Sequence, residues 1–174
     1  MALSVGTKSL LYGVHAFWLH SFFILAAWIK LYGWPRELPI YISFVCHDLG
    51  YFGKPNMDGP EGERHPELGA KIMHYLFDKR IVLKNRTSIT KNVIYGSSKW
   101  QDFTLYHSRK YVKRDNVQPS KLCCADKVAF LLMPRSIYLF LARLSGEIEE
   151  YKTESHMQNA SDWYLACISR KRNT

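Results

Sequence analysis

The sequence predicts an all-α protein that forms one domain over residues 1–174. Segments with apolar residues at helical spacing alternate with short loops rich in Gly, Pro, Asn and Asp, and no internal repeat or low-complexity stretch breaks the series. The composition agrees, because a chain that is 47% hydrophobic and 14% aromatic can fill a packed core and is too apolar to stay disordered.

The first helical pattern covers residues 7–31, with Phe17 as the expected position of any break. Gly, Trp and Pro at positions 33–35 end it. Its apolar stripe contains a histidine, His20, at helical spacing from its apolar neighbours. Residues 12–34 are apolar enough to resemble a membrane span, but two histidines and a lysine interrupt them. We therefore predict a buried helix and no transmembrane segment.

The next helix is predicted over residues 36–49, with His47 and Asp48 adjacent at its C-terminal end. An apolar run precedes this pair, so both side chains should emerge at the wall of the core. A loop over residues 50–64 follows and is longer than most connections, which favours a functional loop. This loop contains the candidate cation Lys54.

Two later helices carry further candidate histidines. His65 opens a helix over residues 65–77, because Pro is favoured at the first helical position and Glu in the first turn. His107 lies on a helix predicted over residues 99–112, among aromatic residues that share its face.

A carboxylate, Asp126, lies on the apolar face of a helix that Ser120 caps and that covers residues 121–132. Burying a carboxylate is costly unless it is paired or bound to a metal. A salt bridge to a neighbouring lysine or arginine is the alternative to a metal site here. After Pro134 the pattern predicts two closing helices, in which we identify no catalytic chemistry.

The candidate side chains are imidazoles and carboxylates, which suit Fe, Mn, Co, Ni or Zn. The four cysteines have neither a CxxC motif nor any other paired metal spacing, which argues against a structural zinc site. We interpret them as buried free thiols in a reducing compartment and predict a cytoplasmic protein.

The formal net charge of +9 favours an anionic partner, such as a nucleotide, a nucleic acid backbone or an acidic lipid surface. Runs of basic residues are typically solvated faces. The run that begins at Arg109 is the exception, because it adjoins the candidate ligand His107.

The order of these residues resembles the HD superfamily of metal-dependent phosphohydrolases, whose pattern is H…HD…D on a bundle of about five helices. The match covers about residues 10–135, which leaves about residues 136–170 as a helical extension. HPELGAKIM resembles the HPxxGxxIL segment of two-metal members, including the HD-GYP phosphodiesterases. FTLYHSR occupies the place of their later His motif, and CCADKVAF resembles the VADxxDAL helix.

The resemblance implies a first metal ion held by two histidines and two carboxylates, with Asp48 bridging to a second ion. The first histidine is His20 or His15; His20 is favoured because it opens an uninterrupted apolar helix. By this resemblance the ligands of the first ion are His20 or His15, His47, Asp48 and Asp126, and those added by the second ion are His65 and His107.

Two departures from the family pattern stand out. HDLGYFGKP is longer than the usual HDIGK, so the match of Lys54 to the family lysine is open. No HHExxDGxGYP motif follows, which argues against a true HD-GYP enzyme.

The resemblance implies a phosphohydrolase or phosphodiesterase that hydrolyses a phosphoester of a small, nucleotide-like anion through a metal-activated water. Asp48 would be catalytic, and Lys54 or Arg109 would hold the phosphate. The ends of nucleic acids are an alternative substrate. Two alternatives are a di-iron oxygenase that uses the same ligand set and a non-enzymatic binding module. The sequence predicts neither the substrate nor the oligomeric state.

Overall fold

The computed structural model describes residues 3–57, 59–78 and 98–149. The predicted all-α class is confirmed, because every regular element in these ranges is a helix. The second predicted closing helix and the end of the predicted extension, residues 150–170, lie outside the described residues, as does Cys167.

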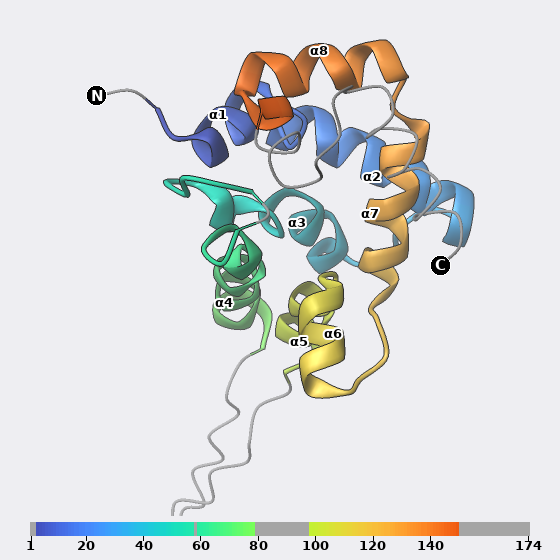
Figure 1. Cartoon of the computed structure of the whole chain (residues 1–174). Coiled ribbons are helices and arrows are strands. Elements are labelled where there is room, and N and C mark those ends of the chain that lie inside the picture. The colour runs from blue at the N-terminus through green and yellow to red at the C-terminus, as the bar shows by residue number, and fades with distance from the viewer. Residues whose placement is uncertain (1–2, 58, 79–97, 150–174) are drawn as a thin grey trace, which may run out of the picture.

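The helices follow one another in the order drawn in Figure 1. They are α1 (Val5–Tyr12), α2 (Phe17–Tyr32), α3 (Leu38–Cys46), the 3-10 turns η1 (Leu49–Tyr51) and η2 (Gly62–Arg64), α4 (Pro66–Phe77), α5 (Lys99–Leu105), α6 (Arg109–Asp115), α7 (Lys121–Leu132) and α8 (Arg135–Ser145).

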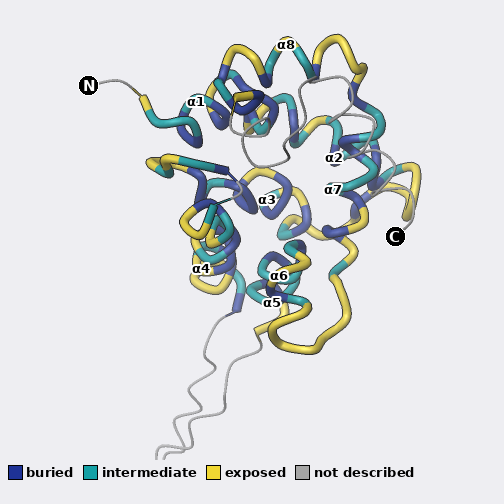
Figure 2. Tube along the Cα trace, in the orientation of Figure 1, coloured by how far each residue is buried: buried dark blue, intermediate teal, exposed yellow. Residues whose placement is uncertain are grey.

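The helix α2 lies at the centre of the packing, against α3 and α7, while α4 packs on α5 and α1 on α8 (Figure 1). Apolar side chains from α2, α3, α4, α5 and α7 form the largest buried cluster. A smaller cluster joins α8 to α7 and to the α1–α2 connection. Figure 2 shows the contrast between this buried centre and the exposed residues 113–119, which form the end of α6 and the start of its connection to α7.

The predicted break in the first helical pattern is confirmed: α1 ends at Tyr12, and α2 begins at Phe17. The helix that follows ends earlier than predicted. Its last residue is Cys46, and His47 is its C-cap. The chain then continues through Asp48 into η1, so the His-Asp pair lies at a change of chain direction.

The predicted helix over residues 99–112 is instead two helices, α5 and α6. The carbonyl of Thr104 accepts the ring Nδ1–H of His107 at 2.6 Å and its backbone N–H at 3.4 Å. Ser108 is then extended, with φ −86° and ψ 125°, before α6 begins. His107 is therefore a turn residue between two short helices, which explains the difference from the predicted single helix.

Side chains cap three helix N-termini among the described residues. At α1, Ser4 accepts the N–H of Thr7 at 3.4 Å, and at α7, Ser120 accepts the N–H of Cys123 at 3.4 Å, as predicted. At α5 the cap comes from a distant part of the chain: the buried carboxylate of Asp78, just after α4, accepts the N–H groups of Trp100 at 3.0 Å and Gln101 at 2.8 Å. This cap fixes α5 to the end of α4.

Within the described residues, no single helix is long and apolar enough to cross a membrane. Two bent pairs reach that length and composition together, namely α1 with α2, bent by 62°, and α7 with α8, bent by 102°.

The thiols match their prediction only in part. Cys46 and Cys123 are buried and free, but Cys124 is exposed. It follows Cys123 directly on α7 and so points to a different side of the helix from its buried neighbour.

Candidate metal centre

Six of the predicted ligands come together at the meeting point of α2, α3, α4 and α7. His20 lies on α2 and Asp126 on α7, whereas the other four lie at helix ends or turns. These six residues, which we call the His/Asp cluster, are His20, His47, Asp48, His65, His107 and Asp126.

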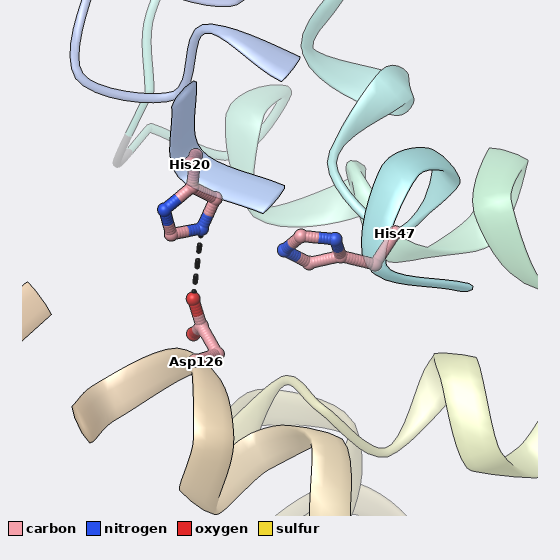
Figure 3. A group of neighbouring side chains, drawn as sticks. All are labelled: His20, His47 and Asp126. Carbon is pink, nitrogen blue, oxygen red and sulfur yellow. Dashed lines mark hydrogen bonds and ion pairs between the residues drawn. The ribbon is translucent and has the colours of Figure 1, made fainter. Parts of the chain in front are cut away.

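One carboxylate oxygen of Asp48 faces the first part of the cluster. Its Oδ2 lies 3.0 Å from Nε2 of His47 and 3.4 Å from Nε2 of His20. Nε2 of His20 also lies 3.0 Å from Oδ1 of Asp126. Figure 3 shows His20 of α2, His47 at the end of α3 and Asp126 of α7 pointing toward one another. We call His20, His47 and Asp126 the Oδ2 half.

The other oxygen of Asp48 faces two more histidines. Its Oδ1 lies 3.5 Å from Nε2 of His65 and 3.6 Å from Nε2 of His107. The two Nε2 atoms lie 3.2 Å from each other. We call His65 and His107 the Oδ1 half, and Asp48 is shared by both halves.

Three of the imidazoles are fixed in one tautomer by the backbone. His47, His65 and His107 each donate Nδ1–H to the carbonyl three residues earlier, at 3.1, 2.8 and 2.6 Å respectively. A neutral imidazole that donates from Nδ1 carries its lone pair on Nε2. In their neutral form all three histidines therefore turn the Nε2 lone pair toward Asp48, the arrangement in which a backbone carbonyl orients a metal-binding histidine.

This arrangement fits a bound cation. In the Oδ1 half, two Nε2 lone pairs face each other at 3.2 Å, which is repulsive unless a positive charge lies between them. In the Oδ2 half, Nε2 of His47 is buried and has no hydrogen-bond partner among the described residues. Two groups of three residues each bring one ligand atom per residue within 4.8 Å of the others in that group. The first group is His20, His47 and Asp126, and the second is His47, Asp48 and His107. The buried His/Asp cluster could thus hold metal.

Two glycines allow the ligand-bearing segments to approach. A Cβ at Gly69 of α4 would lie 2.5 Å from the carbonyl oxygen of Cys46, so only glycine permits this contact between α4 and the end of α3. A Cβ at Gly50 would lie 2.0 Å from the carbonyl oxygen of His65. Any side chain at either position would push His65 away from the His-Asp pair.

Contacts on the outer side hold the Oδ1 half together. The hydroxyl of Tyr111 on α6 donates to Glu67 of α4 at 2.6 Å, and Lys110 forms an ion pair with Glu63. The ring of Tyr51 stacks on His65, with centroids 4.0 Å apart. These contacts join the two turns that carry the histidines of this half.

The electrostatics favour ionised carboxylates. Burial opposes ionisation of Asp48, but the charge of His47 outweighs it and, with the imidazole of His107 close by, holds the pKa of Asp48 well below the usual range. Burial likewise opposes ionisation of Asp126, and the hydrogen bond from His20 outweighs it and lowers the pKa. Both carboxylates are therefore anionic and available as ligands.

The histidines differ in their protonation. Burial lowers the pKa of His65 to about 3, and burial also lowers the pKa of His20. For His47 burial acts in the same sense, but the charge of Asp48 outweighs it and raises the pKa. A metal ion would have to displace a proton from His47, which couples metal binding to pH.

The alternative first ligand, His15, lies beside the cluster. Its ring centroid is 5.5 Å from that of His20, and its Nδ1 lies 3.0 Å from Oγ of Ser9 and 3.6 Å from Oε2 of Glu147. Burial opposes protonation of His15, but the hydrogen bond and charge of Glu147 outweigh it and raise the pKa of His15 to about 9. Of the two alternatives, His20 is the residue in contact with Asp48, and His15 pairs with Glu147.

A cavity of about 250 Å³ opens beside the cluster. Arg109, predicted to hold phosphate, lies in its wall. Lys54 is not among the described residues that line it; its carbonyl accepts the N–H of Gly6 at 3.0 Å, which places this part of the loop against α1. The wall consists of His15, Asp48, Tyr51, His65, His107, Ser108, Arg109, Asp126 and Lys127.

Three residues near the site were not predicted from the sequence. Glu147 is fully buried beside His15 in the segment where no chemistry was predicted, and Tyr51 and Lys127 line the cavity. Glu147 is one of three glutamates in a short stretch, and no local pattern marks it as the buried one. Lys127 directly follows Asp126, which was the one available signal.

Comparisons with protein-family models, with curated proteins and with solved structures give no match for this chain. The resemblance to the HD superfamily therefore depends on the motifs and on the cluster geometry alone.

Proposed function

We propose that this chain is a metal-dependent phosphohydrolase of the HD type, which binds two divalent transition-metal ions and hydrolyses a phosphoester of a small, nucleotide-like anion. In this proposal the Oδ2 half of the cluster holds one ion, the Oδ1 half holds the other, and Asp48 bridges them.

The observation that carries the proposal is the division of ligands between the two oxygens of Asp48. Oδ2 faces His20 and His47, and Oδ1 faces His65 and His107. Because Nδ1–H of His65 and of His107 is donated to the backbone, the contact of their Nε2 atoms at 3.2 Å requires a positive charge between them, either a proton on one ring or a metal ion. A second cation explains this pairing directly.

The donor set supports Fe, Mn, Co, Ni or Zn, because imidazole and carboxylate suit these ions and no thiolate joins the cluster among the described residues. Bound there, such ions would lower the pKa of a coordinated water and stabilise negative charge on a phosphoryl oxygen. The protein itself supplies fixed imidazole orientations and an anionic bridge.

The cavity supports an anionic substrate. Arg109 lies in the wall beside His107, and a guanidinium binds two phosphate oxygens through parallel hydrogen bonds. The carboxylates in the same wall, Asp48 and Asp126, are both assigned to metal ions, so the remaining charge of the cavity is positive.

The test is to purify the protein without oxygen and to count Fe, Mn, Co, Ni and Zn per chain, then to measure phosphate release from phosphoesters and oxygen uptake in parallel. The variants are His47→Ala and Asp126→Ala. His74→Ala is the matched control, because His74 is an exposed histidine of α4 outside the cluster.

We expect about two ions per chain in the wild type and in His74→Ala, with phosphate release that both cluster variants lose. Turnover that consumes oxygen at bound iron, without phosphate release, would replace the hydrolase by an oxygenase. Unchanged metal content and activity in both cluster variants would disprove the metal site.

A further inference from the structure

Two cationic side chains lie in the wall of the cavity, one beside each half of the cluster. Arg109 opens α6, two residues after His107 of the Oδ1 half. Lys127 follows Asp126 of the Oδ2 half on α7. The two cations therefore reach the same cavity from two different helices.

Among the described residues, neither Arg109 nor Lys127 forms an ion pair with a carboxylate. Other cations of this part of the chain are paired, as Lys110 is with Glu63 and Lys99 with Glu37. The Lys127 side chain lies close to the Cys123 thiol, a neutral neighbour that leaves its charge uncompensated.

The charge of the cavity is unbalanced once metal is bound. Two divalent ions and the two side-chain cations face only the carboxylates of Asp48 and Asp126 in the cavity wall. A terminal phosphate carries close to two negative charges at neutral pH, because its second pKa is about 6. A phosphodiester carries one, so it compensates less of this charge.

From this arrangement we propose that Arg109 and Lys127 form a subsite for a terminal, dianionic phosphate, and that the substrate of the proposed phosphohydrolase is a phosphomonoester. This inference rests on the proposed function. Arg109 binds phosphate oxygens on the Oδ1 side and Lys127 on the Oδ2 side, which orients the phosphoryl group across the cluster.

The size of the cavity agrees with this assignment. Its volume of about 250 Å³ is below the ~300–1,000 Å³ typical of pockets that enclose a drug-sized ligand. It therefore encloses the phosphoryl group and the adjoining part of the alcohol, and a larger group such as a nucleobase lies outside.

The test compares two esters with the same leaving group, p-nitrophenyl phosphate and bis(p-nitrophenyl) phosphate, on the metal-loaded full-length protein. The variants are Lys127→Met, Lys127→Arg and the control Lys113→Met, which removes the same charge from an exposed position on α6. Metal content is counted for each variant, and binding of inorganic phosphate is measured by calorimetry.

We expect the wild type to prefer the monoester. Lys127→Met should lower kcat/KM for the monoester by about 10-fold to 100-fold, the loss of one charge-assisted hydrogen bond, and leave the diester within about 3-fold. It should also weaken phosphate binding at unchanged metal content, and Lys127→Arg should recover most of both losses. Lys113→Met should resemble the wild type.

A wild type that prefers the diester, or equal losses on both esters in Lys127→Met, would overturn the subsite. If neither ester is cleaved, the proposed hydrolase is wrong, and phosphate binding then decides the subsite separately. In that case, weaker binding in Lys127→Met than in Lys113→Met supports the subsite, and equal binding overturns it.

Discussion

The two halves of the His/Asp cluster share Asp48 but are built from different parts of the fold. The Oδ2 half takes His20 from the first turn of α2 and Asp126 from the middle of α7, two core helices that pack on each other. The Oδ1 half consists of His65 at the N-cap of α4 and His107 in the turn between α5 and α6. One half depends on helix packing and the other on turns.

This difference predicts two sites with unequal affinities for metal. An ion in the Oδ2 half would meet two imidazoles and the carboxylates of Asp48 and Asp126, whereas an ion in the Oδ1 half would meet two imidazoles and Asp48. The extra carboxylate adds a negative charge at short distance. We therefore expect the Oδ2 half to keep its ion when the Oδ1 half has lost its own.

The largest expected effect comes from Asp48→Asn, because it removes the charge that both halves share. We expect metal content to fall from about two ions to below one per chain and activity to fall by more than about 100-fold. This loss exceeds the roughly 10- to 100-fold loss expected when a residue that only hydrogen-bonds a metal ligand is changed. Elemental analysis and phosphate release measure both. Asp115→Asn, an exposed acid on α6, is the control. Retention of two ions in Asp48→Asn would rule out the bridge.

A smaller effect should follow from His65→Ala, which removes one ligand of the Oδ1 half only. We expect about one ion per chain to remain, and adding His107→Ala should remove no further metal, because both residues serve the same ion. Metal titration followed by elemental analysis distinguishes the variants. If His65→Ala lost the ions of both halves, the proposal that the Oδ2 half binds metal more tightly would be wrong.

The ion pair between His15 and the buried Glu147, beside the Oδ2 half, should give the metal-free protein a pH-dependent stability. The pKa of His15 is raised from 6.5 to about 9, so the contribution of the pair is complete below about pH 6.5 and is lost as pH rises through about 9. Glu147→Gln should lower the unfolding free energy by about 3 kcal/mol at about pH 6.5, and this difference should shrink as the pH rises through about 9. Urea denaturation of chelator-treated protein at both pH values measures the change.

The control for this prediction is Glu149→Gln, which changes an exposed glutamate two residues later. It should leave the stability within about 0.5 kcal/mol of the wild type at either pH. A Glu147→Gln variant with the same cost at low and high pH would show that His15 does not titrate with this pair.

The smallest effect is expected for Tyr111→Phe, which removes the hydrogen bond from α6 to Glu67 on the outer side of the Oδ1 half. We expect a loss of about 1 kcal/mol in stability and about 10-fold in affinity for the weaker ion, with the tighter ion unchanged. Tyr106→Phe, whose hydroxyl bonds the exposed Asp115, is the control. An equal loss of affinity for both ions would mean that α6 supports the whole cluster.

Helical periodicity predicted the fold class and the helices that carry His20 and Asp126, because these depend on apolar spacing within one segment. It placed His107 inside a helix, where the structure has a turn, because a hydrogen bond from the histidine ring to the Thr104 carbonyl lies outside any propensity pattern. Glu147 and Lys127 were missed because their importance comes from contacts between distant segments. A lysine or glutamate in a charged stretch has no local sign of such a partner.

The carboxylate of Asp78 bonds the backbone of residues 100 and 101, so the chain leaves α4 and re-enters α5 at one anchored point. A single side chain therefore fastens the start of α5 to the end of α4. Asp78→Ala would leave two N–H groups of the first turn of α5 without their acceptor and would loosen the turn that carries His107, although Asp78 itself is no metal ligand.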